Sequence, residues 1–152
     1  MTPIRAMHQR SRQAGATAIE FALVASIFFM LLIGIAEFSR VLFYWNTAGE
    51  ATRLGARIAV VCDVTDTAIK DRMTYLMPLL KDTNIQVAYE PSGCDADADT
   101  ARNSCRSVTV SVADVSVKTF IPVVPITVSM PPFSTTLPRE SLDSATSGKI
   151  CN

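Results

Sequence analysis

Three residues near the N-terminus have types and a spacing that suggest chemistry. Gly15 precedes Ala16, and Glu20 stands at the start of a long apolar run. Cleavage after Gly15 would make Ala16 a free α-amine, which a helix places one turn (i, i+4) before the Glu20 carboxylate. In an apolar bundle an unpaired charge is penalised strongly and a matched pair much less. The spacing would therefore bring a newly cut chain end within one helical turn of Glu20.

The apolar run after Glu20 is the element that would position this pair. From Phe21 to Ala36 the chain carries no charge, which corresponds to about 24 Å of helix against a hydrocarbon core of about 30 Å. The aromatic segment 41–45 (VLFYW) supplies the remaining length, because Tyr and Trp suit the membrane–water boundary. We expect a tilted transmembrane helix over residues 16–45. The simpler interpretation of Glu20 is that it lies at the cytoplasmic rim and reaches water through its flexible stem.

The distribution of charge sets the expected orientation of this helix. Arg5, Arg10 and Arg12 precede the first acidic residue of the chain. By the positive-inside rule, the N-terminus then lies in the cytoplasm and everything after residue 45 is exported. Glu37 and Arg40, at i, i+3 near the outer end, are most simply an intrahelical pair, and the alternative is pairing between subunits.

The cysteines agree with export to an oxidising compartment. All four lie beyond the expected span, at Cys62, Cys94, Cys105 and Cys151. Four cysteines allow three pairings. We favour Cys94 with Cys105, which closes a short loop, and this leaves Cys62 to hold the C-terminus through Cys151.

The helical pattern continues past the expected membrane surface. Mostly small residues recur at i, i+3, i+4 and i+7 spacing and form one stripe, made of Ala48, Ala51, Thr52, Gly55, Ile58, Ala59 and Cys62. We therefore expect one stem helix over residues 16–61, about 69 Å long. Small residues let another backbone approach closely, so we assign Ala48, Ala51, Gly55 and Ala59 to packing between subunits.

Beyond the stem, the pattern predicts a second helix and a small antiparallel sheet. Asp66 can cap a helix that Pro78 should end near Met77. Its expected buried face is Ile69, Met73, Leu76, Met77 and Leu80. Alternation then predicts strands near residues 85–89, 108–112 and 126–130, with a bulge or break near Ala113 and Asp114. The prolines of "FIPVVP" and "MPPF" predict edges or crossings, and we expect the polar tail 141–152 to be loose apart from Cys151.

Other candidate chemistry is weak. In "CDADADTARNSCR", Asp95, Asp97 and Asp99 imitate the start of a calcium loop, but Thr100 replaces the required Gly and Arg106 the bidentate Glu. A solvated acidic loop held by a disulfide is the favoured interpretation, and we expect no metal site and no cofactor.

A catalytic set and a nucleic-acid interface are also disfavoured. The single histidine, His8, lies in the expected leader, and the sequence has no G-x-S-x-G motif, P-loop or zinc spacing. We therefore expect no enzymatic activity. The formal net charge is zero, without the basic surplus that phosphate backbones require.

The segment "GATAIEF", Gly15 to Phe21, resembles the processing site of type IV prepilins. There, a short basic leader ends at Gly, Glu stands at the fifth mature position, and a hydrophobic helix follows. The continuation resembles the TadE-like family, pseudopilins or minor pilins of the tight-adherence (Flp) pilus system, with both the TadE and the TadF paralogue open. The matching motifs are Glu20-Phe21-Ala22, Glu37-Phe38-Ser39-Arg40 and Gly55-Ala56-Arg57, within residues 10–61.

This resemblance implies a substrate of a membrane prepilin peptidase, cut between Gly15 and Ala16. It also implies an ion pair between the freed Ala16 amine and Glu20 of the same or a neighbouring subunit. Residues 1–15 would be a cleaved cytoplasmic leader, 16–45 a transmembrane helix, and 46–152 an exported α+β head that includes the outer half of the stem. Such a lollipop-shaped pilin would sit in the bacterial inner membrane with its head in the periplasm or outside the cell. Its expected partners are membrane lipid, other pilins and the pilus assembly machinery, and its expected task is pilus assembly by helix packing and head contacts.

Two alternatives make different predictions for the mature N-terminus. An unrelated single-pass protein with a periplasmic binding domain would keep Met1. A secreted disulfide-bonded protein would lose an ordinary signal peptide, but Glu20 and the absence of an A-x-A site before Glu37 argue against it.

Overall fold

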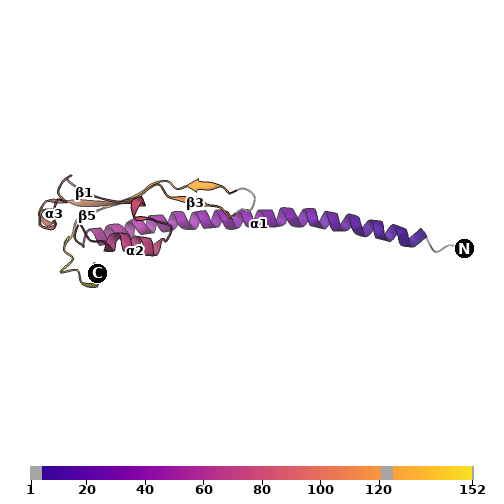
Figure 1. The fold of residues 1–152 in the computed structure, drawn as a ribbon, viewed down its shortest axis with the longest axis horizontal. Coiled ribbons are helices and arrows are strands. Elements are labelled where there is room, and N and C mark those ends of the chain that lie inside the picture. The colour runs from indigo at the N-terminus through magenta and orange to yellow at the C-terminus, as the bar shows by residue number, and fades with distance from the viewer. Residues whose placement is uncertain (1–4, 121–124, 152) are drawn as a thin grey trace. The chain divides into compact units, whose positions relative to one another are not determined.

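The computed structural model describes residues 5–120 and 125–151, with side chains from residue 15 onward. Its helices are α1 (Arg5–Ala59), α2 (Ala68–Leu76) and α3 (Ala98–Ser104), with short 3₁₀ turns η1 (Asp82–Asn84) and η2 (Gly148–Ile150). Its strands are β1 (Ile85–Glu90), β2 (Ser107–Val112), β3 (Ser116–Lys118), β4 (Thr127–Ser129) and β5 (Phe133–Pro138) (Figure 1). The fold class is α+β, as predicted.

The chain divides into two compact units, Met1–Arg40 and Val41–Asn152, and α1 contributes to both. In the first unit, α1 begins at Arg5 and not near residue 16, because the segment after Pro3 is rich in good helix formers and contains no proline. Residues 1–4 of the expected leader lie outside the described residues. From residue 15 onward, the large apolar side chains of this unit are exposed, and Phe21, for example, is 75% accessible.

The second unit contains a three-stranded antiparallel sheet with the order β1-β2-β5. Strands β1 and β2 were predicted from alternation, and the inward side chains Val108, Val110 and Val112 of β2 are buried. The sequence did not predict β5. Its alternation is hidden because Thr135 takes an inward position between Phe133 and Leu137.

Strands β3 and β4 form a separate two-stranded sheet. The predicted change of parity coincides with Asp114, whose φ of 58° lies in the left-handed region. Val115 and Val117 are buried beyond this point. Pro131 and Pro132 lie between β4 and β5, where the chain crosses from one sheet to the other, as predicted. Pro122 of "FIPVVP" lies outside the described residues.

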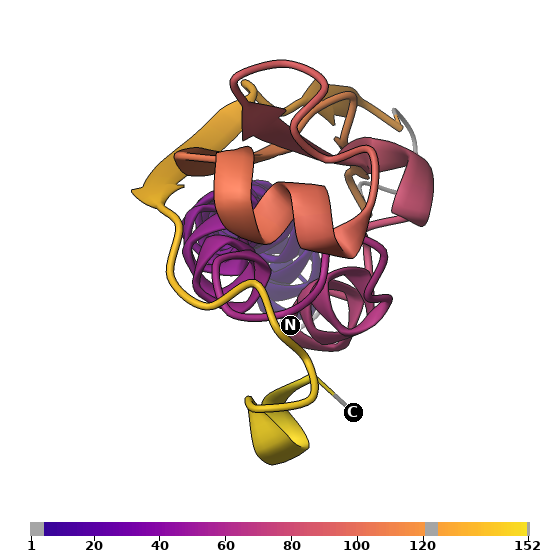
Figure 2. The same ribbon diagram turned by 90° about the vertical axis from the view of Figure 1, so that its left-hand side faces the viewer.

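The core of the second unit lies between the three-stranded sheet and two helices. Figure 2 shows α2 beside α1 on the same side of the sheet. Of the predicted inward residues of α2, Ile69, Met73, Met77 and Leu80 are buried. The prediction for Leu76 was wrong, because α2 ends at this residue and its side chain is 41% exposed.

The small-residue stripe of α1 is part of this core, which corrects its assignment to packing between subunits. Ala48, Ala51 and Ala59 are fully buried within the chain. At Gly55 an added Cβ would overlap Met73 Sδ and come within 3.1 Å of Val110 Cγ1. The small side chains do allow close approach, but the elements that approach are α2 and the sheet of the same chain.

The C-terminal tail is held in place, so the expectation of a loose tail was wrong. Leu142 is fully buried. The backbone N–H of Glu140 donates to the Val60 carbonyl at 3.1 Å, and Ser141 Oγ donates to Val61 at 3.0 Å. These carbonyls follow the end of α1 and need donors from outside the helix, which the tail supplies.

Candidate assembly segment

The expected processing residues lie on α1 in the first unit. Gly15, Ala16, Glu20 and Phe21 are all exposed, and the Gly15–Ala16 bond lies inside the helix. Nothing lies within 4 Å of the position that a Cβ on Gly15 would take. Ala16 and Glu20 are one helical turn apart, so the geometry is compatible with the predicted ion pair. The pair itself stays a prediction.

Glu37 and Arg40 form a salt bridge within α1. Arg40 Nη2 donates to Glu37 Oε2 at 2.7 Å, and the two side chains are 13% (Glu37) and 25% (Arg40) exposed. This arrangement favours the intrahelical interpretation, and pairing between subunits stays a prediction. A paired carboxylate costs far less in a poorly hydrated environment than an isolated one.

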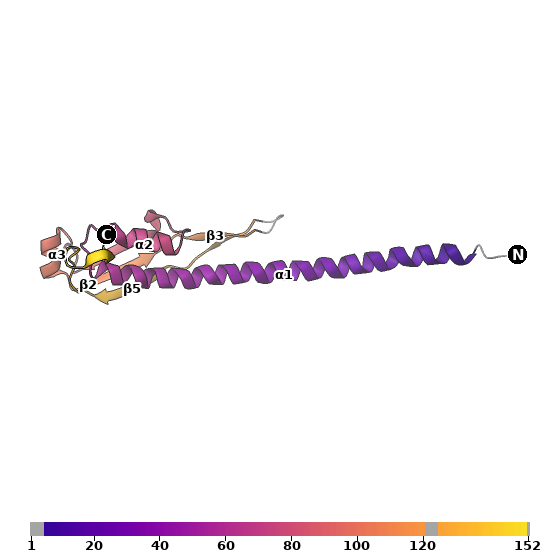
Figure 3. The same cartoon turned by 90° about the horizontal axis from the view of Figure 1, so that it is seen from below.

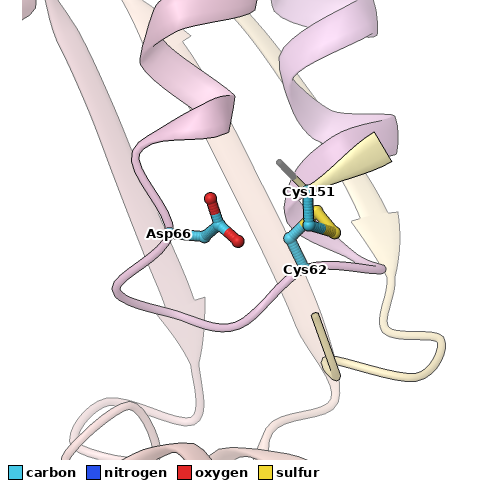
Figure 4. A group of neighbouring side chains, drawn as sticks. All are labelled: Cys62, Asp66 and Cys151. Atoms are coloured by element: carbon cyan, nitrogen blue, oxygen red, sulfur yellow. A yellow bond between two sulfur atoms is a disulfide. The ribbon is translucent and has the colours of Figure 1, made fainter. Parts of the chain in front are cut away.

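Both disulfides favoured from the sequence form. Cys94 pairs with Cys105, and Cys62 at the end of α1 pairs with Cys151 in the tail. Asp66 lies beside the second bond, and its carboxylate and the two sulfurs lie within 4.8 Å of one another (Figure 4).

These three groups are ligand types that metals accept, but here their atoms have other partners. The sulfurs are bonded to each other. Asp66 accepts from Ser144 Oγ at 2.6 Å and from the backbone N–H of Ala68 at 2.9 Å. The disulfide therefore ties the tail to the end of α1, and Asp66 ties it to the start of α2 through hydrogen bonds.

Arg102, on α3, is a structural residue that the sequence analysis missed. Its guanidinium donates to Asp63 at 2.8 Å and to the Leu142 carbonyl at 2.9 Å, and it also contacts Asp99 and Asp143. The hydrogen bond to Asp63, together with the nearby carboxylates, raises the pKa of Arg102. Arg102 thereby joins α3, the segment after α1 and the tail, which are far apart in sequence.

The acidic loop uses its carboxylates to begin α3. Asp97 is the N-cap residue and accepts from the Thr100 backbone N–H at 2.8 Å and from Thr100 Oγ1 at 2.7 Å. These two hydrogen bonds lower the pKa of Asp97. The Cys94–Cys105 disulfide closes the loop around this cap. The favoured interpretation, an acidic loop held by a disulfide, agrees with this geometry.

The second unit also has an apolar groove on its surface. This groove of about 480 Å³ lies between α1, α2 and η2, and its lining residues are Leu54, Ile58, Arg72, Tyr75, Leu76, Lys149 and Ile150.

Tyr89 is buried, and its hydroxyl has no hydrogen-bond partner among the described residues. Burial, followed by the nearby Asp95 and Asp66, raises the pKa of Tyr89 to about 12.

The fold and the exposed apolar helix describe a protein with one candidate membrane span. Among the described residues, the helical segment Gly15–Ala59 is long and apolar enough to cross a membrane, and its most apolar part is not buried in the protein. This is the pattern of a single-pass membrane protein with an α+β domain after the span.

Residues 15–57 match the sequence model of the TadE-like protein family. The resemblance predicted from the sequence is thereby confirmed over this segment, which is TadE-like. The match suggests involvement in the tight-adherence pilus system. No curated protein and no solved structure matches the chain.

Proposed function

We propose that this chain is a pseudopilin or minor pilin that takes part in assembly of a tight-adherence pilus. The observation that carries the proposal is the TadE-like match over residues 15–57, which includes the Gly15–Ala16 bond, Glu20 and the apolar helix. The exposed apolar surface of α1 in the first unit supports it, because such a surface needs lipid or other apolar helices around it. We propose no enzymatic activity.

In this proposal the chain inserts with its N-terminus in the cytoplasm and its head outside the inner membrane. A prepilin peptidase then hydrolyses the Gly15–Ala16 peptide bond and frees the Ala16 amine. That amine pairs with Glu20 of its own or a neighbouring subunit. Cleavage thus converts a helix with one unpaired carboxylate into a helix with matched charges.

Magnitudes favour pairing over an isolated carboxylate. A lone charge at the centre of a membrane helix costs about 2.5–3.5 kcal/mol on insertion scales. Two opposite charges about 4 Å apart attract by about 4 kcal/mol at an effective dielectric constant of about 20. The attraction offsets the insertion cost of the carboxylate. When the pair forms between neighbouring subunits, it makes the aligned arrangement of helices more stable than a misaligned one.

The decisive experiment is N-terminal sequencing of membrane-extracted protein, expressed with the prepilin peptidase. We expect Ala16 as the first residue of the wild type and an intact leader in Gly15→Ala. Glu20→Ala should reduce co-assembly with other pilins. Ser26→Ala is a matched control, because Ser26 is exposed in the same helix. Its Oγ donates a hydrogen bond to the Leu23 carbonyl of that helix.

The outcomes separate the proposal from its alternatives. Unchanged leader removal and co-assembly in both Gly15→Ala and Glu20→Ala would refute it. A membrane-bound protein that begins at Met1 would indicate an unrelated single-pass protein. A soluble protein with a later start would indicate a secreted one.

A further inference from the structure

The end of the β3–β4 hairpin is unusually apolar for a surface element. After the Lys118–Thr127 pair, the ladder continues with a 2.9 Å bond from the Thr119 backbone N–H to the Ile126 carbonyl. Phe120 is 78% exposed and Ile126 is 49% exposed. The sequence carries no charge between Lys118 and Thr127. An exposed strand pair normally protects its end with polar or charged side chains, so this end requires an explanation.

Contacts with α1 establish the direction in which the hairpin points. Thr135 Oγ1 donates to Thr52 Oγ1 at 3.1 Å, and the Glu140 N–H donates to the Val60 carbonyl, so β5 runs in the same direction as α1. Strand β2 is antiparallel to β5 and therefore runs back toward Val41. Strand β3 continues along this path, and Figures 1 and 3 show the hairpin beyond the three-stranded sheet on that side.

The hairpin is long enough to reach the start of the second unit. Val110 pairs with Thr135, which contacts Thr52, so the two strands and the helix share a common level. From Val110 to Phe120, extended chain at about 3.3 Å per residue covers up to about 33 Å. From Thr52 back to Val41, helix at about 1.5 Å per residue covers about 16 Å. The hairpin is therefore long enough to reach the level of Val41, the first residue of the second unit.

We propose that the β3–β4 hairpin is a second membrane contact, with Phe120, Pro125 and Ile126 inserted at the boundary between lipid headgroups and acyl chains. Lys118, at the base of this apolar end, is exposed and suited to the lipid phosphates. The proposal rests on these described residues. A second contact would fix the rotation of the head about the membrane normal, which a single helix cannot do. It requires a membrane-inserted chain and does not depend on a role in a pilus.

The native cysteines make a clean test available. All four are in disulfides, so Ile126→Cys introduces a unique thiol for a nitrobenzoxadiazole (NBD) label. The labelled full chain is placed in vesicles of phosphatidylcholine and phosphatidylglycerol that contain lipids spin-labelled near the headgroup. Ser134→Cys is the matched control, because Ser134 is exposed on β5 in the main sheet.

We expect the NBD label at position 126 to be quenched severalfold more than the label at 134. Adding Phe120→Asp to the Ile126→Cys chain should lower this quenching, because a carboxylate opposes insertion into lipid. Equal quenching at positions 126 and 134 would overturn the proposal. So would an unquenched label at 126.

Discussion

Gly55 offers a sharp test of how the head is packed against α1. It lies in the middle of the helix, where glycine is normally unfavourable, and its position is fully enclosed. An added Cβ would overlap Met73 Sδ, and Met73 is itself fully buried, with no solvent into which it could move. Gly49 lies in the same helix, but nothing lies within 4 Å of its Cβ position. Gly55→Ala and Gly49→Ala therefore differ in packing and share the change in helix propensity.

The expected difference follows from two opposing effects. Replacing a helical glycine by alanine stabilises a helix by about 1 kcal/mol. Adding a methyl group to a filled core destabilises by about 1–3 kcal/mol. Gly49→Ala gains only the first effect, whereas Gly55→Ala has both. The free energy of unfolding of Gly55→Ala should therefore lie about 1–3 kcal/mol below that of Gly49→Ala.

Denaturant unfolding in detergent micelles measures this difference. Trp45 is the single tryptophan and packs against the core of the second unit, so its fluorescence reports on the head. The Gly55→Ala loss should shrink in a Met73→Ala background, where the overlapping atom is absent. If Gly55→Ala is as stable as Gly49→Ala, the small-residue stripe of α1 does not pack inside the chain. That result would support the original assignment of the stripe to contacts between subunits.

Two further predictions concern the disulfides and Tyr89. Replacing Cys62 and Cys151 by Ala should lower the free energy of unfolding by about 4–5 kcal/mol, and replacing Cys94 and Cys105 by about 3 kcal/mol, because the sequence separations are 89 and 11 residues. A larger loss in the free energy of unfolding on removal of the Cys94–Cys105 disulfide than of the Cys62–Cys151 disulfide, measured by denaturant unfolding, would contradict this prediction. Tyr89 is neutral in the folded head, and its pKa is raised from 10.0 to about 12, so its contribution is complete below pH 10 and is lost as the pH rises toward 12. Tyr89→Phe should lose less stability over this window in the same assay, and an identical loss in both proteins would refute the assignment.

The parts of the fold that the sequence predicts are those with an uninterrupted local pattern. The span can be predicted because the run from Phe21 to Ala36 has no charge. Strand β2 can be predicted because valine alternates with serine and threonine. Strand β5 cannot be predicted in this way, because its inward Thr135 is polar and forms a hydrogen bond with Thr52 on α1. A local period cannot indicate a partner so distant in sequence.

The candidate site follows the same rule: contiguous motifs could be predicted from the sequence, and contacts between distant residues could not. The processing motif is contiguous, so the sequence identifies it, whereas the partners of Arg102 lie far away in the chain, at Asp63 and in the tail. The small-residue stripe shows the limit most clearly. Its spacing correctly predicts a close approach to α1, but residue size alone does not say which backbone approaches.

The burial of the stripe changes where contacts between subunits can form on α1. Most of the exposed large apolar side chains of α1 are in the first unit, and Phe21 and Phe28 are examples. In lipid these side chains gain little from association, because acyl chains solvate them as well as another helix does. A polar interaction then has to select one alignment of helices over the others. Glu20 is the acidic residue at the head of this surface, and leader cleavage creates its cationic partner, so in the proposed mechanism processing and alignment are a single event.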